Sequence, residues 1–349
     1  MRTVAFVQSR MGSTRFPNKV MQPIGEIPLI GVLLERLAGS REIDEVIVAT
    51  TVSERDDPLV NYVRSLGYQA FRGSEEDVLD RFYRAALVAK ADVVVRITGD
   101  CPLIDPGVVD EVISQWQSSG ADYGSNVDPP TFPDGLDTEV FSFKALETAW
   151  KEASPGFHRE HVTPFLRESP QFSRVNVEAH ADQSSERWTV DEGEDLEVVR
   201  KIFANFSPRR DFTWLQVTAL RNSHPEWFVG NEHLTRNEGM ASGTGQKLWK
   251  RAKRVIPGGN MFLSKRAEMY LPDQWPSYYS RAEGCRVWDL DGREFIDMAL
   301  MGVGTNTLGY GHPEVDEAVR GTVSAGNMSS LNCPEEVYLV EKLLELHPW

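Results

Sequence analysis

The stretch Val4-Ala5-Phe6-Val7-Gln8, which runs directly into Ser9-Arg10-Met11-Gly12-Ser13, decides the fold. A continuous apolar run that breaks into a loop of small and polar residues is typical of a buried parallel strand. Similar steps recur over the first 205 residues and alternate with segments of helical periodicity. This alternation predicts an α/β fold, in which helices cover both faces of a mostly parallel sheet.

The expected elements of this region alternate regularly. Strands are expected at 4–8, 45–50, 68–71 and 92–97, and helices at 28–37, 56–66, 74–90 and 105–117. Ser74 and Asp77 fit an S-x-x-D capping box for the third helix, and Asp105 is expected to cap the fourth, which begins with Pro106. In such folds, ligands bind at the carboxyl ends of the strands.

The loop after the first strand predicts a polyphosphate site. It carries three cations, Arg10, Arg15 and Lys19, around the small residues Gly12 and Ser13. Small residues let backbone N–H groups approach a phosphate closely. Three cations in one loop repel each other, and an anion bound between them would remove this repulsion. The alternative is a basic loop that is simply solvated. The Walker spacing GxxxxGK[ST] is absent, so this is a different kind of phosphate loop.

Two carboxylates stand where strands are expected to end. Asp100 follows the valine-rich strand, and Asp191 lies between a strand and a helix. Each has a structural alternative, because Asp100 could cap a turn and Asp191 could cap the helix with Glu194 three residues on. Carboxylates beside a phosphate loop are suitable ligands for a hard cation. Together with the loop, they predict a metal–triphosphate site.

Composition limits the classes of function. The chain has 349 residues, enough for two domains, and its net charge of -15 argues against a nucleic-acid partner. The apolar run at the start is too short for a signal peptide or a membrane span, so no membrane association is expected. Three widely spaced cysteines, Cys101, Cys285 and Cys333, are consistent with reduced thiols in the cytoplasm. The oligomeric state stays open, with a homodimer as one option.

The pattern changes after residue 221. Segments rich in Asn, Gly and Ser around 237–245 are typical of a linker, and we expect domains at 1–240 and 241–349. The second begins with a helix at 246–255 and contains Asp291-Gly292 between apolar alternations, a hairpin signal. It ends directly after an amphipathic helix. We expect this segment to be an incomplete domain, because it would expose more core-facing surface than it covers.

The first segment resembles a known family. Its loop R-M-G-S-T-R-x-P-x-K is similar to the signature of the CMP-sugar-acid synthetases, which include the CMP-Kdo and acylneuraminate cytidylyltransferases. It is closest to the branch called spore coat polysaccharide biosynthesis protein F. The similarity continues through residues 71–81, 96–105, 132–141, 159–164, 189–191, 194–196 and 236–239.

The resemblance implies a nucleotide-diphospho-sugar transferase fold, CTP as the donor and an acidic sugar as the acceptor. By matching position, Asp100 and Asp191 would hold Mg²⁺. The triphosphate would be held by Arg10, Gly12, Ser13, Arg15 and Lys19. Of these residues, we expect Arg15, Lys19 and Asp100 to be catalytic, with Ser74 as a further contact to the nucleotide. One departure is Asp191-Glu192-Gly193, where the family usually has Asp-Thr-Pro.

The expected reaction is attack of a sugar hydroxyl on the α-phosphorus, with pyrophosphate leaving. Positioning and electrostatic stabilisation dominate such transfers. Contacts to the acceptor are expected from Asp137, Glu139, Arg159 and His161. Of these, Arg159 could pair with a sugar carboxylate. The alternative is that each of these four residues only packs in a loop or lies at the surface.

The second segment resembles the beginning of class III aminotransferases that use pyridoxal phosphate, of the glutamate-1-semialdehyde aminomutase type. Matching stretches are 251–252, 257–259, 288–292, 295–298, 308–313 and 334–337. The match stops before that family's phosphate-binding loop and Schiff-base lysine. We therefore expect pyridoxal phosphate to bind a full-length aminotransferase but not this chain stably.

Three functions remain open. The leading one is a cytidylyltransferase for a 3-deoxy-2-keto sugar acid in cell-surface polysaccharide biosynthesis. The second is a transferase of the same fold with another nucleotide donor, or a glycosyltransferase, which the phosphate loop disfavours. In the third, the first domain is a non-catalytic docking module for an aminotransferase.

Overall fold

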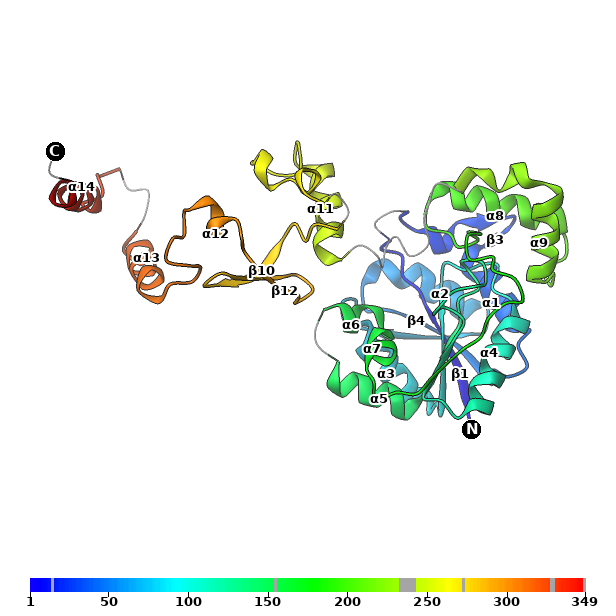
Figure 1. Ribbon diagram of the computed structural model, residues 1–349. Coiled ribbons are helices and arrows are strands. Elements are labelled where there is room, and N and C mark those ends of the chain that lie inside the picture. Colours follow the sequence, from blue (N-terminus) through cyan, green and yellow to red (C-terminus); the bar gives the residue numbers. More distant parts are fainter. Residues whose placement is uncertain (14–15, 154–155, 232–242, 272–273, 327–329, 348–349) are drawn as a thin grey trace. The chain divides into compact units, whose positions relative to one another are not determined.

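The computed structural model describes residues 1–13, 16–153, 156–231, 243–271, 274–326 and 330–347. The chain divides into a first unit, Met1–Ala241, and a second unit, Ser242–Trp349. Figure 1 shows the elements of both, coloured along the sequence, and each unit is described by itself.

A seven-stranded sheet forms the centre of the first unit, in the order β5-β4-β1-β6-β8-β7-β9. Its strands are β1 (Thr3–Gln8), β4 (Glu45–Thr51), β5 (Gln69–Gly73), β6 (Val93–Thr98), β7 (Tyr123–Ser125), β8 (Glu139–Ser142) and β9 (Arg174–Asn176). β8 is antiparallel to its neighbours β6 and β7, whereas the other neighbouring strands pair in parallel. The predicted mostly parallel sheet is confirmed, but β7, β8 and β9 were not anticipated from the sequence.

The apolar run of β1 is buried on both sides. Ala5 and Val7 belong to the core on one face of the sheet, and Val4 and Phe6 to the core on the other face. All four side chains are fully buried. This is the reason for a continuous apolar run in a central parallel strand, where side chains alternate between two covered faces.

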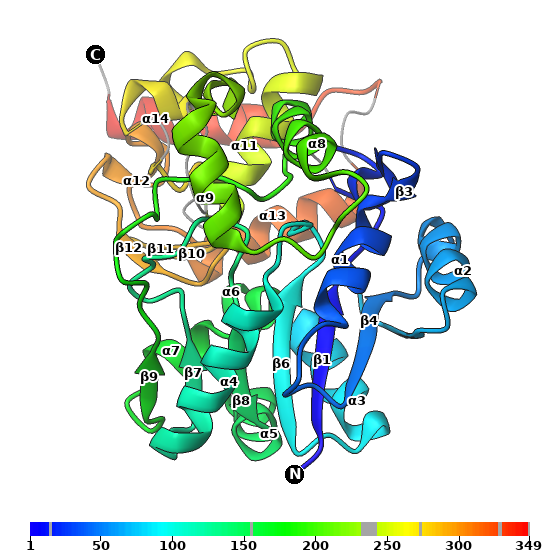
Figure 2. The same ribbon diagram turned by 90° about the vertical axis from the view of Figure 1, so that its right-hand side faces the viewer.

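Helices cover both faces, as predicted. The helices that contribute to the core of Ala5 and Val7 are α1 (Leu29–Leu37), α2 (Asp57–Ser65), α4 (Pro106–Ser119), α8 (Gly193–Phe206) and α9 (Trp214–Ser223). Those in the core of Val4 and Phe6 are α3 (Val78–Ala89), α5 (Phe143–Glu152) and α7 (Pro164–Glu168). In Figure 2, α1 and α4 lie in front of the sheet, and α3 and α5 lie behind it.

Short elements complete the first unit. They are the ribbon β2 (Pro23–Ile24) with β3 (Ile27–Pro28), the helix α6 (Phe157–His161), and the 3-10 helices η1 (Lys19–Met21), η2 (Glu54–Asp56), η3 (Pro225–Trp227) and η4 (Val229–Asn231). Among the helices of the described ranges, none is both long and apolar enough to cross a bilayer.

The two predicted helix caps have different outcomes. Asp105 caps α4 as expected, since its side chain accepts a hydrogen bond from the Gly107 N–H. The capping box at Ser74 is wrong, because α3 begins only at Val78. Its cap is Asp77, which accepts from the Asp80 N–H at 2.8 Å. Ser74 instead accepts from the Asp77 N–H at 3.0 Å, in the turn that leads into the helix.

The second unit contains a three-stranded antiparallel sheet, β10 (Tyr279–Glu283), β11 (Arg286–Asp289) and β12 (Glu294–Ile296). The predicted hairpin joins β11 to β12, and Gly292 in its turn has a φ of 79°. The other elements are α11 (Thr244–Val255), η5 (Leu263–Lys265), η6 (Ala267–Met269), α12 (Leu300–Val303), α13 (Pro313–Ala325) and α14 (Glu335–Leu346). A small core joins Trp249, Ala252 and Ala267, whereas apolar side chains of α13 and α14 are exposed.

Candidate active site

The phosphate loop is fixed to the sheet by a buried carboxylate. Asp56 is 1% exposed and accepts a hydrogen bond from the Met11 N–H at 2.8 Å. It also accepts from the Thr50 hydroxyl at 2.8 Å and from the Thr51 N–H at 3.1 Å. Although burial disfavours the charged form, these hydrogen bonds outweigh it and lower the pKa of Asp56. The loop after β1 is thereby held against the end of the neighbouring strand β4.

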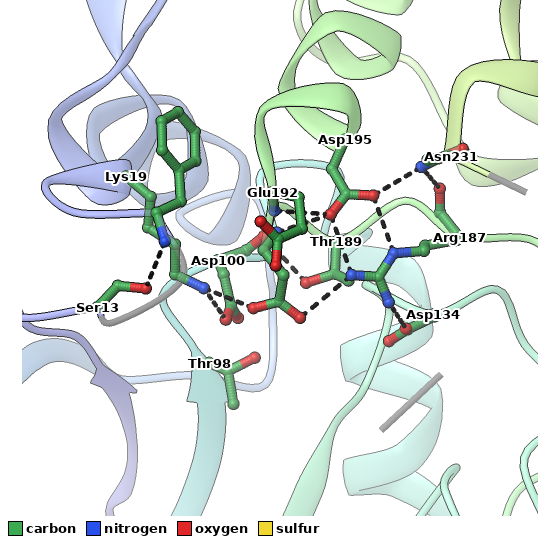
Figure 3. Close-up of polar contacts among 12 residues, drawn as sticks. Ser13, Lys19, Thr98, Asp100, Asp134, Arg187, Thr189, Glu192, Asp195 and Asn231 are labelled. Atoms are coloured by element: carbon green, nitrogen blue, oxygen red, sulfur yellow. Dashed lines mark hydrogen bonds and ion pairs between the residues drawn. The ribbon is translucent and has the colours of Figure 1, made fainter. Parts of the chain in front are cut away.

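Lys19 lies between the two predicted metal ligands. Its ammonium Nζ is 2.7 Å from Asp100 Oδ2 and 2.8 Å from Asp191 Oδ1. Figure 3 shows Lys19 directed at Asp100, which follows the end of β6. The lysine is 8% exposed, so the three groups form a mostly buried cluster. The structure thus brings together residues that stand 81 and 172 positions apart in the sequence.

The charges in this cluster stabilise each other. Burial of Asp100 opposes its ionisation, but the charge and the hydrogen bond of Lys19 outweigh burial and lower the pKa of Asp100 to about 2. For Lys19, burial favours the neutral amine, whereas the charges of Asp100 and Asp191 outweigh it and raise the pKa. Asp100 and Lys19 are therefore both charged at neutral pH.

Asp191 is not the cap of the following helix. The N-cap of α8 is Glu192, which forms a reciprocal capping box with Asp195. Asp195 accepts from the backbone N–H groups of Asp191 and Glu192, at 2.9 and 3.0 Å. The alternative role of Asp191 as a helix cap is therefore wrong, and its carboxylate contacts Lys19 instead.

A buried arginine holds Asp191 from the other side. Arg187 Nη2 is 3.2 Å from Asp191 Oδ2, and its Nε and Nη2 form a fork on Asp195 at 2.9 and 3.0 Å. It also lies 3.4 Å from Asp134, as Figure 3 shows. Asn231 donates 2.8 Å and 3.0 Å hydrogen bonds to Asp195 and to the Arg187 carbonyl. This network fixes the orientation of the Asp191 carboxylate.

Backbone contacts join the segments that carry Asp100 and Asp191. The Asp100 carbonyl accepts a hydrogen bond from the Val190 N–H at 2.8 Å and another from the Thr189 hydroxyl at 3.3 Å. The spacing between the two carboxylates is therefore set by the backbone and not by their side chains alone.

The donor set fits a divalent metal ion bound together with a ligand. Two carboxylate oxygens converge on one point, occupied by Lys19 Nζ. Mg²⁺ is commonly held by one or two carboxylates plus substrate phosphates. Among the described residues, no group of three or more His, Cys, Asp or Glu could hold a metal ion.

The other predicted residues of the phosphate loop lie nearby but are less enclosed. Arg10 has a side chain that is 44% exposed and lies 3.5 Å from Glu75. Gly12 also faces Glu75, because a Cβ at this glycine would lie 3.7 Å from the Glu75 carboxylate. The Ser13 hydroxyl accepts from the Phe16 N–H at 3.3 Å and closes the loop. Arg15 lies outside the described residues.

The four expected acceptor contacts do not have equivalent surroundings. Glu139 is 5% exposed, and its carboxylate contacts both Arg96 and Tyr123. The Arg159 Nε donates to Asp77 Oδ2 at 2.6 Å, so this guanidinium ties α6 to the start of α3.

The remaining two have different neighbours. The ring of His161 packs against Phe157 at a centroid distance of 4.7 Å. Burial raises the pKa of the Cys101 thiol, and the charges of Asp100 and Asp137 add to this rise.

Asp56, Arg187 and Asn231 are the positioning residues that sequence reasoning missed. Arg187 directly precedes the Trp188-Thr189-Val190-Asp191 stretch, so its position beside a predicted ligand was the available signal. Asp56 and Asn231 gave no comparable signal, because their roles depend on contacts with residues at least 36 positions away: Asp56 with Met11, and Asn231 with Asp195.

The second unit has a recognisable relative. It is the glutamate-1-semialdehyde 2,1-aminomutase of Methanopyrus kandleri, which is 41% identical over 102 residues. That match covers 29% of this chain but only 22% of the aminomutase. The expected resemblance of the second unit to such enzymes is confirmed, and it concerns a fraction of their length.

The first unit has relatives along its whole length. The sequence model of the cytidylyltransferase family matches residues 4–208. The spore coat polysaccharide biosynthesis protein SpsF of Bacillus subtilis is 32% identical over 235 residues, 65% of this chain and 97% of that protein. A 3-deoxy-manno-octulosonate cytidylyltransferase of Geobacter sulfurreducens is 35% identical over 116 residues, 33% of this chain and 45% of that enzyme.

A solved structure agrees in fold. A cytidylyltransferase from Leptospira borgpetersenii superposes with a TM-score of 0.63 and 30% identity, covering 65% of this chain and 97% of that one. Asp100 follows β6, whereas the strand expected before Asp191 is wrong, because the described segment between β9 and α8 forms only an isolated bridge from Arg187 to Asp134. The sequence match, the fold and the cluster of Lys19, Asp100 and Asp191 agree. The chain therefore belongs to the cytidylyltransferase family, and it is a nucleotidyltransferase.

Proposed function

We propose that the first unit transfers CMP from CTP to a 3-deoxy-2-keto sugar acid, releases pyrophosphate, and depends on Mg²⁺. The observation that carries this proposal is the pair of carboxylates, Asp100 and Asp191, held around one cation position beside the phosphate loop. Membership of the cytidylyltransferase family supports the donor. The names of two relatives, a polysaccharide biosynthesis protein and a 3-deoxy-manno-octulosonate cytidylyltransferase, support the acceptor.

In the proposed reaction, a sugar hydroxyl oxygen forms a bond to the α-phosphorus of CTP. The bond from that phosphorus to the bridging oxygen breaks, pyrophosphate leaves with its electron pair, and the hydroxyl gives its proton to solvent. A bound Mg²⁺ would neutralise charge on the phosphate oxygens. Asp100 and Asp191 would hold this ion, and Arg187 keeps Asp191 oriented for it.

The cations of the phosphate loop act on the leaving group. Arg10, Arg15 and Lys19 would offset the charge that develops on pyrophosphate, and the backbone around Gly12 and Ser13 would donate hydrogen bonds to it. Asp56 keeps the Met11 end of this loop against the sheet, which would hold that part of the loop in place when the nucleotide binds. Ser74 remains our proposal for a further contact to the nucleotide.

For the acceptor, we retain Asp137, Glu139, Arg159 and His161 as the proposed contacts. Arg159 would have to exchange its contact with Asp77 for a sugar carboxylate. Glu139 would act through Arg96, with which it forms a buried ion pair.

The decisive experiment measures pyrophosphate release with CTP, MgCl₂ and a panel of keto-sugar acids. We expect release with CTP and one acidic acceptor, and none after chelation of Mg²⁺ or in Asp100→Asn. Release with another nucleotide would move the protein to a different donor class. If no nucleotide supports release with any acceptor, the docking-module function would gain support.

The second unit lies outside this reaction. We propose that the units act as two domains divided near residue 241, and that the second is an aminotransferase-derived domain. An aminotransferase segment beside a cytidylyltransferase suggests an aminated sugar as substrate or product. We also propose a cytoplasmic location, where CTP is made and the free thiols of Cys101, Cys285 and Cys333 stay reduced.

A further inference from the structure

We propose that Lys19 is an exchangeable internal cation, whose ammonium occupies the metal position and so makes metal binding depend on triphosphate binding. This inference rests on the proposed function and adds a second role for Lys19. In the structure the lysine holds Asp100 and Asp191 together, and in the nucleotide complex it would turn to the triphosphate.

The ammonium and a metal ion cannot share the site. Lys19 Nζ lies 2.7 Å from Asp100 Oδ2 and 2.8 Å from Asp191 Oδ1. An ion bound to both oxygens at the usual Mg–O distance of about 2.1 Å would overlap the position of Nζ. With Lys19 in place, the attraction of the two carboxylates for a metal is also opposed by a unit positive charge. Metal entry therefore requires Lys19 to leave.

The carboxylates have other contacts that would keep them in place after Lys19 leaves. Asp191 is also contacted by Arg187 at 3.2 Å, and the segments that carry the two aspartates are joined by the Val190 N–H and the Asp100 carbonyl. Lys19, by contrast, has a flexible stem of four carbons that can swing about its backbone position. The site is thus rigid on the carboxylate side and movable on the lysine side.

The position of Lys19 in the chain gives it a second anion to contact. It is the first residue of η1, at the end of the loop that we propose to bind the triphosphate. The backbone of this loop folds back on itself, since the Asn18 N–H donates to the Met11 carbonyl at 3.1 Å. A triphosphate held by this loop would offer Lys19 a replacement for the carboxylates.

Thermodynamic coupling follows from this exchange. If triphosphate draws Lys19 away, it raises the affinity of the site for metal, and by linkage metal raises the affinity for triphosphate by the same factor. Without nucleotide, the wild-type site should therefore bind a divalent ion weakly. Removal of the lysine charge should remove the competition between Lys19 and the metal ion, so that the site binds metal without nucleotide.

The test is a titration with Mn²⁺ alone, read by electron paramagnetic resonance, on wild type, Lys19→Met, Lys19→Arg and Lys144→Met. Lys144 is exposed on α5 and serves as the matched loss of one lysine charge. We expect Lys19→Met to bind Mn²⁺ at least about tenfold more tightly than wild type, because an opposing unit charge is gone. Lys19→Arg and Lys144→Met should behave as wild type. Equal or weaker binding by Lys19→Met would overturn the proposal.

Two further readouts keep the proposal testable. If Lys19→Met folds only with added MgCl₂, seen as a metal-dependent thermal midpoint that wild type lacks, the proposal is supported. In wild type, Mn²⁺ bound without nucleotide should have a Kd weaker than about 1 mM. Tight Mn²⁺ binding by wild type that is lost in Asp191→Asn would refute the exchange.

The outcome is separable from that of the proposed function. Turnover of CTP by wild type without a gain of metal affinity in Lys19→Met would sink the exchange and leave the function standing. A gain of metal affinity without CTP turnover by wild type would do the reverse.

Discussion

Replacement of Arg187 should test whether the orientation of Asp191 depends on the buried network. Arg187 has a side chain that is 6% exposed, and it contacts Asp134, Asp191 and Asp195. The change Arg187→Met keeps much of the volume but removes the charge, the fork on Asp195 and the contact with Asp191. Asp195 is fully buried, so it would be left with an uncompensated charge.

The expected loss of stability in Arg187→Met follows from the burial of these charged groups. Removal of one partner from a buried ion pair typically costs about 3–5 kcal/mol. In a unit of this size, a loss of about 3 kcal/mol lowers Tm by about 6–12 °C. Arg187→Lys keeps the charge but cannot form the planar fork, so we expect an intermediate loss. Asn231 still donates to Asp195, which limits the damage to the helix cap.

The assay is a thermal melt followed by CTP turnover at a temperature where each variant is folded. The control is Arg209→Met, which removes an arginine that is 60% exposed and paired with Asp211 at the surface. Such exposed pairs contribute about 0–1 kcal/mol. We expect the folded Arg187 variants to lose turnover while still binding CMP. The reasoning is refuted if Arg187→Met melts within about 2 °C of Arg209→Met and retains full turnover.

Three other predictions follow from the same contacts. Asp56→Asn should lower the free energy of unfolding at pH 7 by about 1–3 kcal/mol. Because folding lowers the pKa of Asp56, the stabilisation that this carboxylate provides is present above pH 3.8 and fades below it. Urea melts of mutant and wild type should therefore converge in acid. Asp100→Asn and Asp191→Asn should each abolish metal-dependent pyrophosphate release but retain the fold, as circular dichroism would show. Lys19→Ala should weaken binding of CTP far more than of CMP in calorimetric titrations, and equal losses would contradict a contact with the leaving phosphates.

Much of the fold was predictable because it rests on local patterns. The strands β1, β4, β5 and β6 lie within a few residues of the expected ranges. β1, β4 and β6 are mostly apolar and buried, whereas the shorter β5 is a mixed segment between two helices. The antiparallel half of the sheet was missed for a physical reason. β7 and β9 have three residues each and gain their stability from neighbouring strands, so they carry no periodicity long enough to recognise.

For the candidate site, the sequence indicated three residues that the structure brings together, but not the contacts between them. A carboxylate after a strand and a basic loop are local features, and the structure brings Lys19, Asp100 and Asp191 together. Their arrangement depends on charge balance between distant segments. The sequence suggested that Lys19 faces phosphate and the aspartates face metal, whereas the structure pairs the lysine with both aspartates. A pattern of residue types cannot distinguish a cation that binds a ligand from one that neutralises the protein's own carboxylates.

The ion pairs of the site indicate why it contains both a fixed cation, Arg187, and a movable one, Lys19. Among the described residues, the ion pairs of Lys19 and Arg187 involve four carboxylates, those of Asp100, Asp134, Asp191 and Asp195. In these pairs, two cations thus contact four carboxylates. Arg187 is held by a bidentate pair and cannot move easily, so it is a permanent part of this balance. Lys19 is the movable member, and its departure toward a phosphate would remove one positive charge from Asp100 and Asp191 at the moment when a metal–triphosphate complex arrives.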